Sequence, residues 1–211
     1  MQRATEFSIM LGAIQLMNSR RTGSEEAFAT FSCDRIRGHK RPHILIGGLG
    51  MGFTLRAALK FLGADARITV AELVPAVVAW ARGPLAGIFG AALKDPRVDI
   101  YDGDVRRLIG SRRLTYDAIL LDVDNGPEGL TRKANDRLYD LKGLRAAHGA
   151  LKPQGILAVW SSTTNKRFTD RLHASGFRSD QIKISAEAAG GARSVIWIAT
   201  PVDERQESGA R

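Results

Sequence analysis

Two aspartates, two positions apart, have the clearest potential for acid–base chemistry in this sequence. Asp122 and Asp124 follow the apolar run 116–121 and precede Asn125 and a Gly-Pro pair. Two carboxylates placed together can hold a cationic amine and accept its proton, and a neighbouring acid raises the pKa of a carboxyl toward that of a general base. The same residues could form an Asx-type turn, although a turn needs only one Asp.

A glycine-rich segment, Gly47-Gly48-Leu49-Gly50-Met51-Gly52, follows another apolar run. Glycines let the backbone turn sharply and approach a ligand closely, and the helix that follows points its N-terminus at that ligand. The spacing of Gly48, Gly50 and Gly52 differs from the G-x-G-x-x-G of dinucleotide sites. Such a turn could also simply pack a helix on a strand.

Two further acids stand after predicted strands. Glu72 could accept hydrogen bonds from both hydroxyls of a ribose, as acids do in Rossmann-type sites. Asp104 could accept one from the exocyclic amine of adenine, or it could cap the helix predicted over 105–109. Each acid has a structural alternative, but acids and glycines at three consecutive strand ends together predict a nucleoside site.

These residues require a sheet that brings the strand ends together. Continuous apolar strands that alternate with helices predict an α/β, Rossmann-like domain, with a mostly parallel sheet covered on both faces. Ligands bind at the carboxyl ends of such strands. The strands are predicted over 43–49, 67–73, 97–101, 116–122, 156–161, 181–184 and 194–200, and the helices over 54–62, 75–82, 136–151 and 168–174, with a turn at 152–155.

Residues 1–41 differ from this pattern. Short apolar runs on either side of Gly12 predict a hairpin, and Ser24 is the expected N-cap of a helix that follows it. We therefore expect an N-terminal extension over 1–41, a nucleotide-binding catalytic domain over 42–201 and a polar tail over 202–211.

Composition is that of an ordinary globular domain, with 44% hydrophobic and 25% charged residues among 211, enough for one core. There is no long apolar run and no signal-type start, and a single cysteine, Cys33, fits a reducing cytoplasm as a buried, inert thiol. The net charge of +9 raises the question of RNA binding. The basic residues are scattered, however, so nucleic acid is not the expected partner.

Taken together, these motifs resemble the spermidine/spermine synthases, which are aminopropyltransferases on the seven-stranded S-adenosylmethionine methyltransferase fold. Between about Ile9 and Ser162, the glycine turn resembles the family's "GGGDGG", and Asp122 resembles the catalytic Asp of its "DSSDP-x-GP" loop. The resemblance also implies ribose contact by Glu72, adenine contact by Asp104, and a place near the nucleoside for Gln15, from a motif resembling "DG-x-x-Q". It places Glu26 near the acceptor, from the family's "Y-[HQ]-E".

The departures from the family lie in the amine half of the site. Gly50 replaces the Asp of "GGGDGG", Asn125 replaces the second Asp of the catalytic loop, and Trp160 replaces a Gln. The resemblance implies an acceptor pocket lined by Glu25, Glu26, Asp124, Asn125 and Trp160, where carboxylates and an aromatic face suit a cation. The sequence therefore resembles a short, spermidine-synthase-like branch.

Three functions stay open at this stage. The first is transfer of an aminopropyl group from decarboxylated S-adenosylmethionine to a small amine or polyamine, with Asp122 as base and Asp124 assisting. The second is methyl transfer, because loss of the Asp at Gly50 leaves room for the carboxylate of intact S-adenosylmethionine. The third is a non-catalytic nucleoside- or RNA-binding module. No metal is expected, and neither the acceptor nor a homodimer is decided by the sequence.

Overall fold

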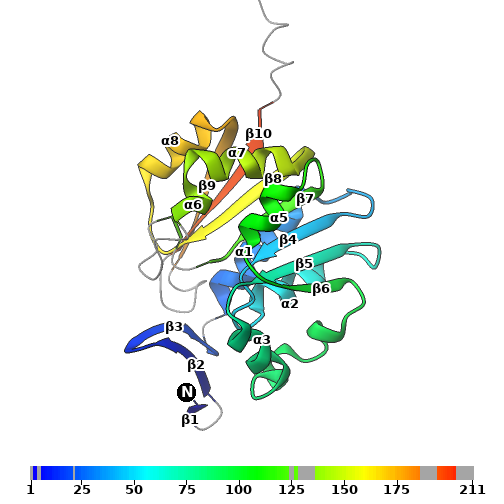
Figure 1. Cartoon of the computed structure of the whole chain (residues 1–211), viewed down its shortest axis with the longest axis vertical. Coiled ribbons are helices and arrows are strands. Elements are labelled where there is room, and N and C mark those ends of the chain that lie inside the picture. Colours follow the sequence, from blue (N-terminus) through cyan, green and yellow to red (C-terminus); the bar gives the residue numbers. More distant parts are fainter. Residues whose placement is uncertain are drawn as a thin grey trace, which may run out of the picture.

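A seven-stranded sheet forms the centre of the molecule (Figure 1). The computed structural model describes residues 2–3, 6–20, 22–123, 126–127, 136–185 and 194–202. The strand order is β6-β5-β4-β7-β8-β10-β9, parallel from β6 to β8 and antiparallel at β10. The strands are β4 (His43–Gly47), β5 (Arg67–Glu72), β6 (Val98–Asp102), β7 (Tyr116–Leu121), β8 (Leu151–Ser161), β9 (Phe177–Ile184) and β10 (Ser194–Pro201).

Helices cover both faces of this sheet, as the apolar strands predict. One core cluster joins the sheet to α1 (Gly23–Arg35), α2 (Phe53–Phe61) and α3 (Pro75–Arg82). The cluster on the other face joins it to α5 (Val105–Ser111), α7 (Leu141–Ala150) and α8 (Lys166–Ala174). The shorter elements are α4 (Ala86–Phe89), the 3-10 helix η1 (Ala92–Lys94) and α6 (Asp136–Tyr139). The predicted α/β, Rossmann-like fold is confirmed.

The N-terminal segment contains the predicted hairpin, formed by β2 (Glu6–Leu11) and β3 (Ile14–Asn18), and β1 (Gln2–Arg3) adds a third strand. Helix α1 contributes buried Phe28 and Cys33 to the core of the main sheet. Burial raises the pKa of the Cys33 thiol to about 12, which agrees with an inert thiol. The division at residue 41 stays a prediction, although α1 packs with the main domain.

Three local predictions are wrong. Thr22, without a side-chain bond, is the N-cap of α1; Ser24 lies inside the first turn, and its hydroxyl bonds to the Glu25 carboxylate instead. The helix predicted over 136–151 is split at Asp140, whose carboxylate caps α7 by accepting from the Gly143 amide at 2.7 Å. The turn predicted at 152–155 lies within β8, where the pairing with β7 shifts register between Tyr116 and Ala118.

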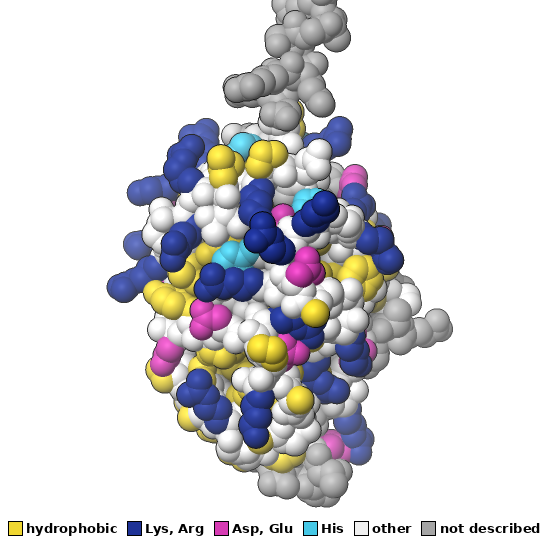
Figure 2. All heavy atoms as spheres, turned by 90° about the vertical axis from the view of Figure 1, so that its right-hand side faces the viewer, with side chains coloured by type: hydrophobic (Ala, Val, Ile, Leu, Met, Phe, Trp, Pro, Cys, Tyr) yellow, Lys and Arg dark blue, Asp and Glu magenta, His cyan; other side chains and the backbone are white. Residues whose placement is uncertain are grey.

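Basic side chains are dispersed over the surface, as expected from the sequence. Figure 2 shows one face on which Lys and Arg lie among acidic and apolar side chains. Several of them form ion pairs, such as Arg67 with Asp99 at 3.6 Å and Arg97 with Asp95 at 2.8 Å. Among the residues described, no helix has the length and apolar character needed to cross a membrane.

Candidate active site

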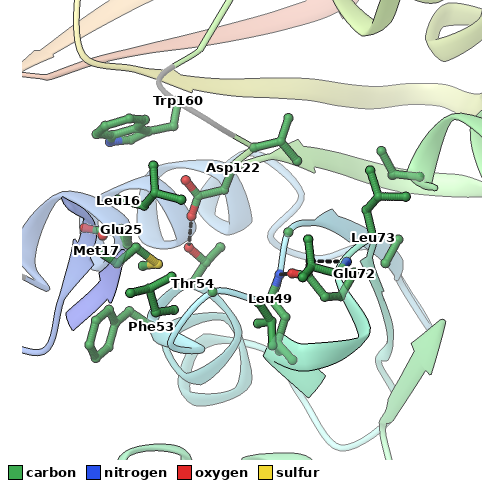
Figure 3. A pocket seen from close by; sticks show the side chains of 18 of the residues that line it. Leu16, Met17, Glu25, Leu49, Phe53, Thr54, Glu72, Leu73, Asp122 and Trp160 are labelled. Atoms are coloured by element: carbon green, nitrogen blue, oxygen red, sulfur yellow. Dashed lines mark hydrogen bonds between the residues drawn. The ribbon is translucent and has the colours of Figure 1, made fainter. Parts of the chain in front are cut away.

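A cavity of about 310 Å³ lies beyond the carboxyl ends of β4, β5 and β7 (Figure 3). This volume falls within the range of small-molecule sites, about 300–1,000 Å³. The walls come from the hairpin, α1, the glycine-rich turn with the start of α2, the end of β5 with the loop after it and α3, the residues after β6 and β7, α6 and the end of β8. The site therefore forms where parallel strands of this fold place their ligands.

The glycine-rich turn forms one wall of the cavity. Gly48 and Gly50 line it with φ of 94° and 50°, a region of backbone conformation that favours glycine. A β-carbon at Gly48 would lie 2.5 Å from the Asp122 carbonyl oxygen. The turn and the end of β7 are therefore in close backbone contact. Gly52, the third predicted glycine, does not line the cavity; it packs against Phe89.

The space beside Gly50 is filled by Met17. A β-carbon built on Gly50 would lie 2.5 Å from Met17 Sδ and 3.1 Å from its Cε. The sequence suggests room at this glycine for a donor carboxylate; Met17 occupies the direction in which a β-carbon would point, and the place of the carboxylate stays a prediction. The hairpin places an apolar thioether there, because it folds over the mouth of the turn.

Glu72 is buried and connects two segments of the cavity wall. Its Oε2 accepts from the Leu49 amide at 2.9 Å, and its Oε1 accepts from the Val74 amide at 2.8 Å. Each carboxylate oxygen can accept a second hydrogen bond. The side chain therefore fixes the glycine turn and keeps acceptor capacity on the cavity wall, where it lies in Figure 3.

Asp104 both caps a helix and lines the cavity. Its Oδ1 accepts from the Arg106 amide at 2.9 Å at the start of α5, and its Oδ2 accepts from Arg106 Nε at 2.8 Å. Burial opposes ionisation, but these bonds from the Arg106 side chain and backbone dominate and lower the pKa of Asp104. The predicted cap is confirmed, and the side chain stays an ionised acceptor at the cavity wall.

Asp122 lies on the opposite wall, directly after β7. Its Oδ2 accepts a hydrogen bond from Thr54 Oγ1 at 2.7 Å. Burial, and after it the charge of Glu25, raise the pKa of Asp122 to about 7 against the lowering effect of the hydrogen bond from Thr54. The sequence predicts a raised pKa from a neighbouring acid; the raised pKa is confirmed, and the acid that the structure supplies is Glu25 of α1.

Glu25, and not Glu26, lines the cavity. Burial raises the pKa of Glu25; hydrogen bonds from the Ser24 side chain and the backbone lower it, and the nearby charge of Glu26 raises it. Glu26 is exposed. Because α1 begins at Gly23 and turns about 100° per residue, adjacent side chains point in different directions, and only one of the two acids reaches the cavity.

Of the other residues predicted for the site, some line the cavity and some do not. Trp160 of β8 lines the cavity, with its indole nitrogen buried and without a hydrogen-bond partner in the part of the chain that is described. Gln15 is exposed and lies outside the cavity wall, where its Nε2 donates to Ser8 Oγ at 3.2 Å. Asp124 and Asn125 fall outside the described residues, so their predicted places stay predictions.

The sequence did not indicate the apolar wall of the cavity or the hydroxyl that bonds to Asp122. Leu16 and Met17 of the hairpin, together with Phe53, line the cavity on the side shown with Asp122 in Figure 3. Their apolar pattern is also typical of packing, so no signal marks them as ligand contacts. Thr54 stands two residues after the last glycine of the turn, and only the fold brings its hydroxyl to Asp122.

The sheet topology, the glycine turn and the acid after the second strand define a Rossmann-like domain of the methyltransferase class. Solved structures agree on the fold: spermidine synthase from Thermotoga maritima superposes with a TM-score of 0.72 at 18% identity, covering 92% of this chain and 65% of that one. Human methyltransferase-like protein 13 in complex with SAH gives 0.60 at 19% identity, covering 86% and 81%.

Relatives found by sequence have a higher identity to this chain than these solved structures do. The chain is 31% identical to polyamine aminopropyltransferase 2 of Hyperthermus butylicus and 33% identical to a polyamine aminopropyltransferase of Nitrosomonas europaea, over 64% and 58% of its length. It spans less than half of these curated relatives, 43% and 35%. No family model matches the chain. These likenesses agree with the resemblance of the motifs to the spermidine/spermine synthases, and the solved structures share the fold of this chain.

Proposed function

We propose that this protein transfers an aminopropyl group from decarboxylated S-adenosylmethionine to a small amine or polyamine. The observation that carries the proposal is that Asp122 lines the same cavity as the glycine-rich turn and Glu72, the residues expected to bind a nucleoside. The pKa of this carboxyl is raised to about 7. The names of the curated relatives support the same reaction.

The nucleoside part of the donor fits the side of the cavity formed by the glycine turn and Glu72. The backbone of Gly48 and Gly50 lets the donor approach the start of α2. Glu72 would accept hydrogen bonds from the two ribose hydroxyls with the lone pairs that the Leu49 and Val74 amides leave free. Asp104 would accept from the exocyclic amine of adenine.

Asp122 would prepare the acceptor for attack. An alkylamine is protonated at neutral pH and has no free electron pair until it loses a proton. A carboxylate within hydrogen-bond reach can hold the ammonium and then accept that proton, and a pKa near neutrality suits both tasks. The amine nitrogen then attacks the carbon beside the sulfonium, a C–N bond forms, and the C–S electron pair returns to sulfur as a neutral thioether.

The acceptor cation would also meet Glu25 and Trp160. Glu25 supplies the second described carboxyl on this side of the cavity, and the ring of Trp160 offers a face that attracts cations. The apolar side chains of Leu16, Met17 and Phe53 would exclude water from the alkyl part of the amine. Asp124 as an assisting acid and Asn125 as an acceptor contact belong to this proposal as well.

Methyl transfer is the second candidate, and Gly50 is the observation that favours it. Among the described residues, Met17 is the side chain that adjoins this glycine, and no carboxylate of that part of the chain stands there to hold the ammonium of an aminopropyl tail. A product assay by mass spectrometry separates the two reactions: the purified chain is incubated with each donor and a panel of diamines, polyamines and monoamines. We expect an aminopropylated product from the decarboxylated donor. A methylated product alone would replace the proposal by the second candidate.

Donor binding supplies an independent measurement. Calorimetry with the two donors on one preparation should show tighter binding of the decarboxylated form. Binding of a nucleoside without turnover of either donor would support a non-catalytic module instead, and submicromolar, salt-sensitive affinity for RNA would extend that reading to nucleic acid.

A further inference from the structure

Thr54 lines the cavity between the glycine-rich turn, which is the proposed donor site, and Asp122. It lies in the first turn of α2, directly after the glycine-rich turn, and its side chain is only 4% exposed. Its hydroxyl donates to Asp122 Oδ2 at 2.7 Å, across 68 positions of sequence. Figure 3 shows this bond, with the other carboxylate oxygen turned away from Thr54.

We propose that Thr54 is a positioning residue that fixes the Asp122 carboxylate and leaves Oδ1 as the oxygen that receives the acceptor's proton. The proposal rests on the proposed function, because it assigns Asp122 the role of base.

The rigidity of the threonine supports this role. A threonine in a helix is restricted to two main χ1 rotamers, and the 2.7 Å bond to Asp122 selects the one that points the hydroxyl at the carboxylate. The backbone beneath it is held as well, because the Asp122 amide donates to the Gly47 carbonyl at 3.0 Å and Gly48 is in close contact with the Asp122 carbonyl. The carboxylate is therefore located by the same turn that would hold the donor, and the orientation needed for attack follows from one rigid element.

The effect of the Thr54 hydroxyl can be measured as a change in the pKa of Asp122. From α1 the charged group that faces Asp122 is Glu25, which raises its pKa; from α2 the neutral Thr54 hydroxyl donates a hydrogen bond, which lowers it. From β8 the neighbouring cavity residue is the uncharged Trp160. Removal of the hydroxyl therefore leaves burial and Glu25 acting without opposition, and the pKa of Asp122 should rise.

The test compares Thr54→Val, which keeps the shape and removes the hydroxyl, with Thr54→Ser, which keeps the hydroxyl. Carbon-13 NMR follows the titration of the Asp122 carboxyl in donor-free protein, with Asp122→Asn to assign the signal. We expect the midpoint to rise by about 0.5–1 pH unit in Thr54→Val, the value of one hydrogen bond to a carboxylate, and to stay near that of the parent in Thr54→Ser.

Kinetics give the second readout. In Thr54→Val, kcat at neutral pH should fall about tenfold, its acid limb should move to higher pH, and the KM for the donor should stay within about twofold. An unchanged titration and an unchanged pH profile in Thr54→Val would overturn the proposal. If the parent turns over no donor, the proposed function fails, but the NMR midpoint still decides whether Thr54 controls Asp122. If Thr54→Val does not fold, Thr54→Ala takes its place in the same titration.

Discussion

Two aspartates at opposite ends of β7 have pKa values shifted in opposite directions. Asp117, near the amino end, is 5% exposed, and its carboxylate interacts with His39 Nδ1 at 2.9 Å, the His43 amide at 2.7 Å and Lys152 Nζ at 2.6 Å. Burial opposes its ionisation, but bonds from Lys152, the His43 amide and His39 dominate and lower its pKa. Asp122, directly after the carboxyl end, has one hydroxyl partner and a pKa raised to about 7.

The difference shows how one strand can carry one carboxyl with a lowered pKa and another with a raised pKa. Both carboxyls are taken from water, so desolvation acts on both in the same direction. A cation and a backbone amide compensate Asp117, which therefore stabilises the fold as an anion. Asp122 has no cation near it among the described residues, and an acid, Glu25, raises its pKa instead. Its charge can be compensated by a cationic ligand in the cavity.

The largest expected effect is on turnover. Asp122→Asn keeps the size of the side chain and removes its basicity, so we expect kcat to fall by roughly 10²–10⁴. Asp117→Asn, the matched control from the other end of β7, should keep kcat within a few-fold of the parent. Steady-state kinetics on both variants check this. Activity of Asp122→Asn close to that of the parent would remove Asp122 from the mechanism.

For the free energy of unfolding, we expect the larger loss from substitution of Asp117 and the smaller from substitution of Asp122. Asp117→Ala removes the partner of Lys152 and of the buried His43 amide, so the free energy of unfolding should drop by about 2–3 kcal/mol. Asp122→Asn should leave it unchanged or raise it, because a partly buried acid without a cationic partner among the described residues is lost. Urea denaturation measures both. Equal losses in the two variants would contradict the contrast between the strand ends.

We expect the affinity for the donor to depend on Glu72. Glu72→Ala should weaken binding of S-adenosylmethionine or methylthioadenosine by about 2 kcal/mol, because charge-assisted hydrogen bonds to the ribose are lost. The exposed Glu26→Ala is the control and should bind as the parent does. Calorimetry on folded samples gives the answer, and unchanged affinity in Glu72→Ala would show that the ribose assignment is wrong.

The pH dependence of stability should separate the two aspartates. The folded chain keeps a proton on Asp122 up to a pKa of about 7, whereas the unfolded chain loses it near 3.8, so this contribution to stability is lost as pH rises through that window. Asp117, with a lowered pKa, contributes stability that is lost as pH falls below its ordinary value. Thermal melts across pH should therefore be flatter from pH 4 to 7 in Asp122→Asn, and flatter below pH 4 in Asp117→Asn.

The smallest effect concerns Glu25. Its charge raises the pKa of Asp122, so Glu25→Gln should move the acid limb of kcat to lower pH by a fraction of a unit. Glu26→Gln, one residue along α1 and exposed, should shift it less. A pH–rate profile distinguishes the two, and equal shifts would mean that the alignment of Glu25 with the cavity is incorrect.

The residues after the strands could be predicted because their positions follow from strand periodicity. Glu72, Asp104 and Asp122 end or follow apolar runs, and parallel strands bring such ends to one edge of the sheet. The acceptor side could not be predicted in the same way, because it combines side chains from α1, the hairpin and β8, which are far apart in sequence. Glu25 and Glu26 are neighbours of one type, and only the rotation of α1 chooses between them.

The sequence by itself determined the order of strands and helices, the sharp glycine turn and the acids at the strand ends, since these depend on local periodicity and on the backbone freedom of glycine. Only the tertiary structure decided which carboxyl is paired with a cation and which has a raised pKa. The pKa of an acid depends on desolvation and on the charges around it, and these come from distant segments: Lys152 and His39 for Asp117, Thr54 and Glu25 for Asp122.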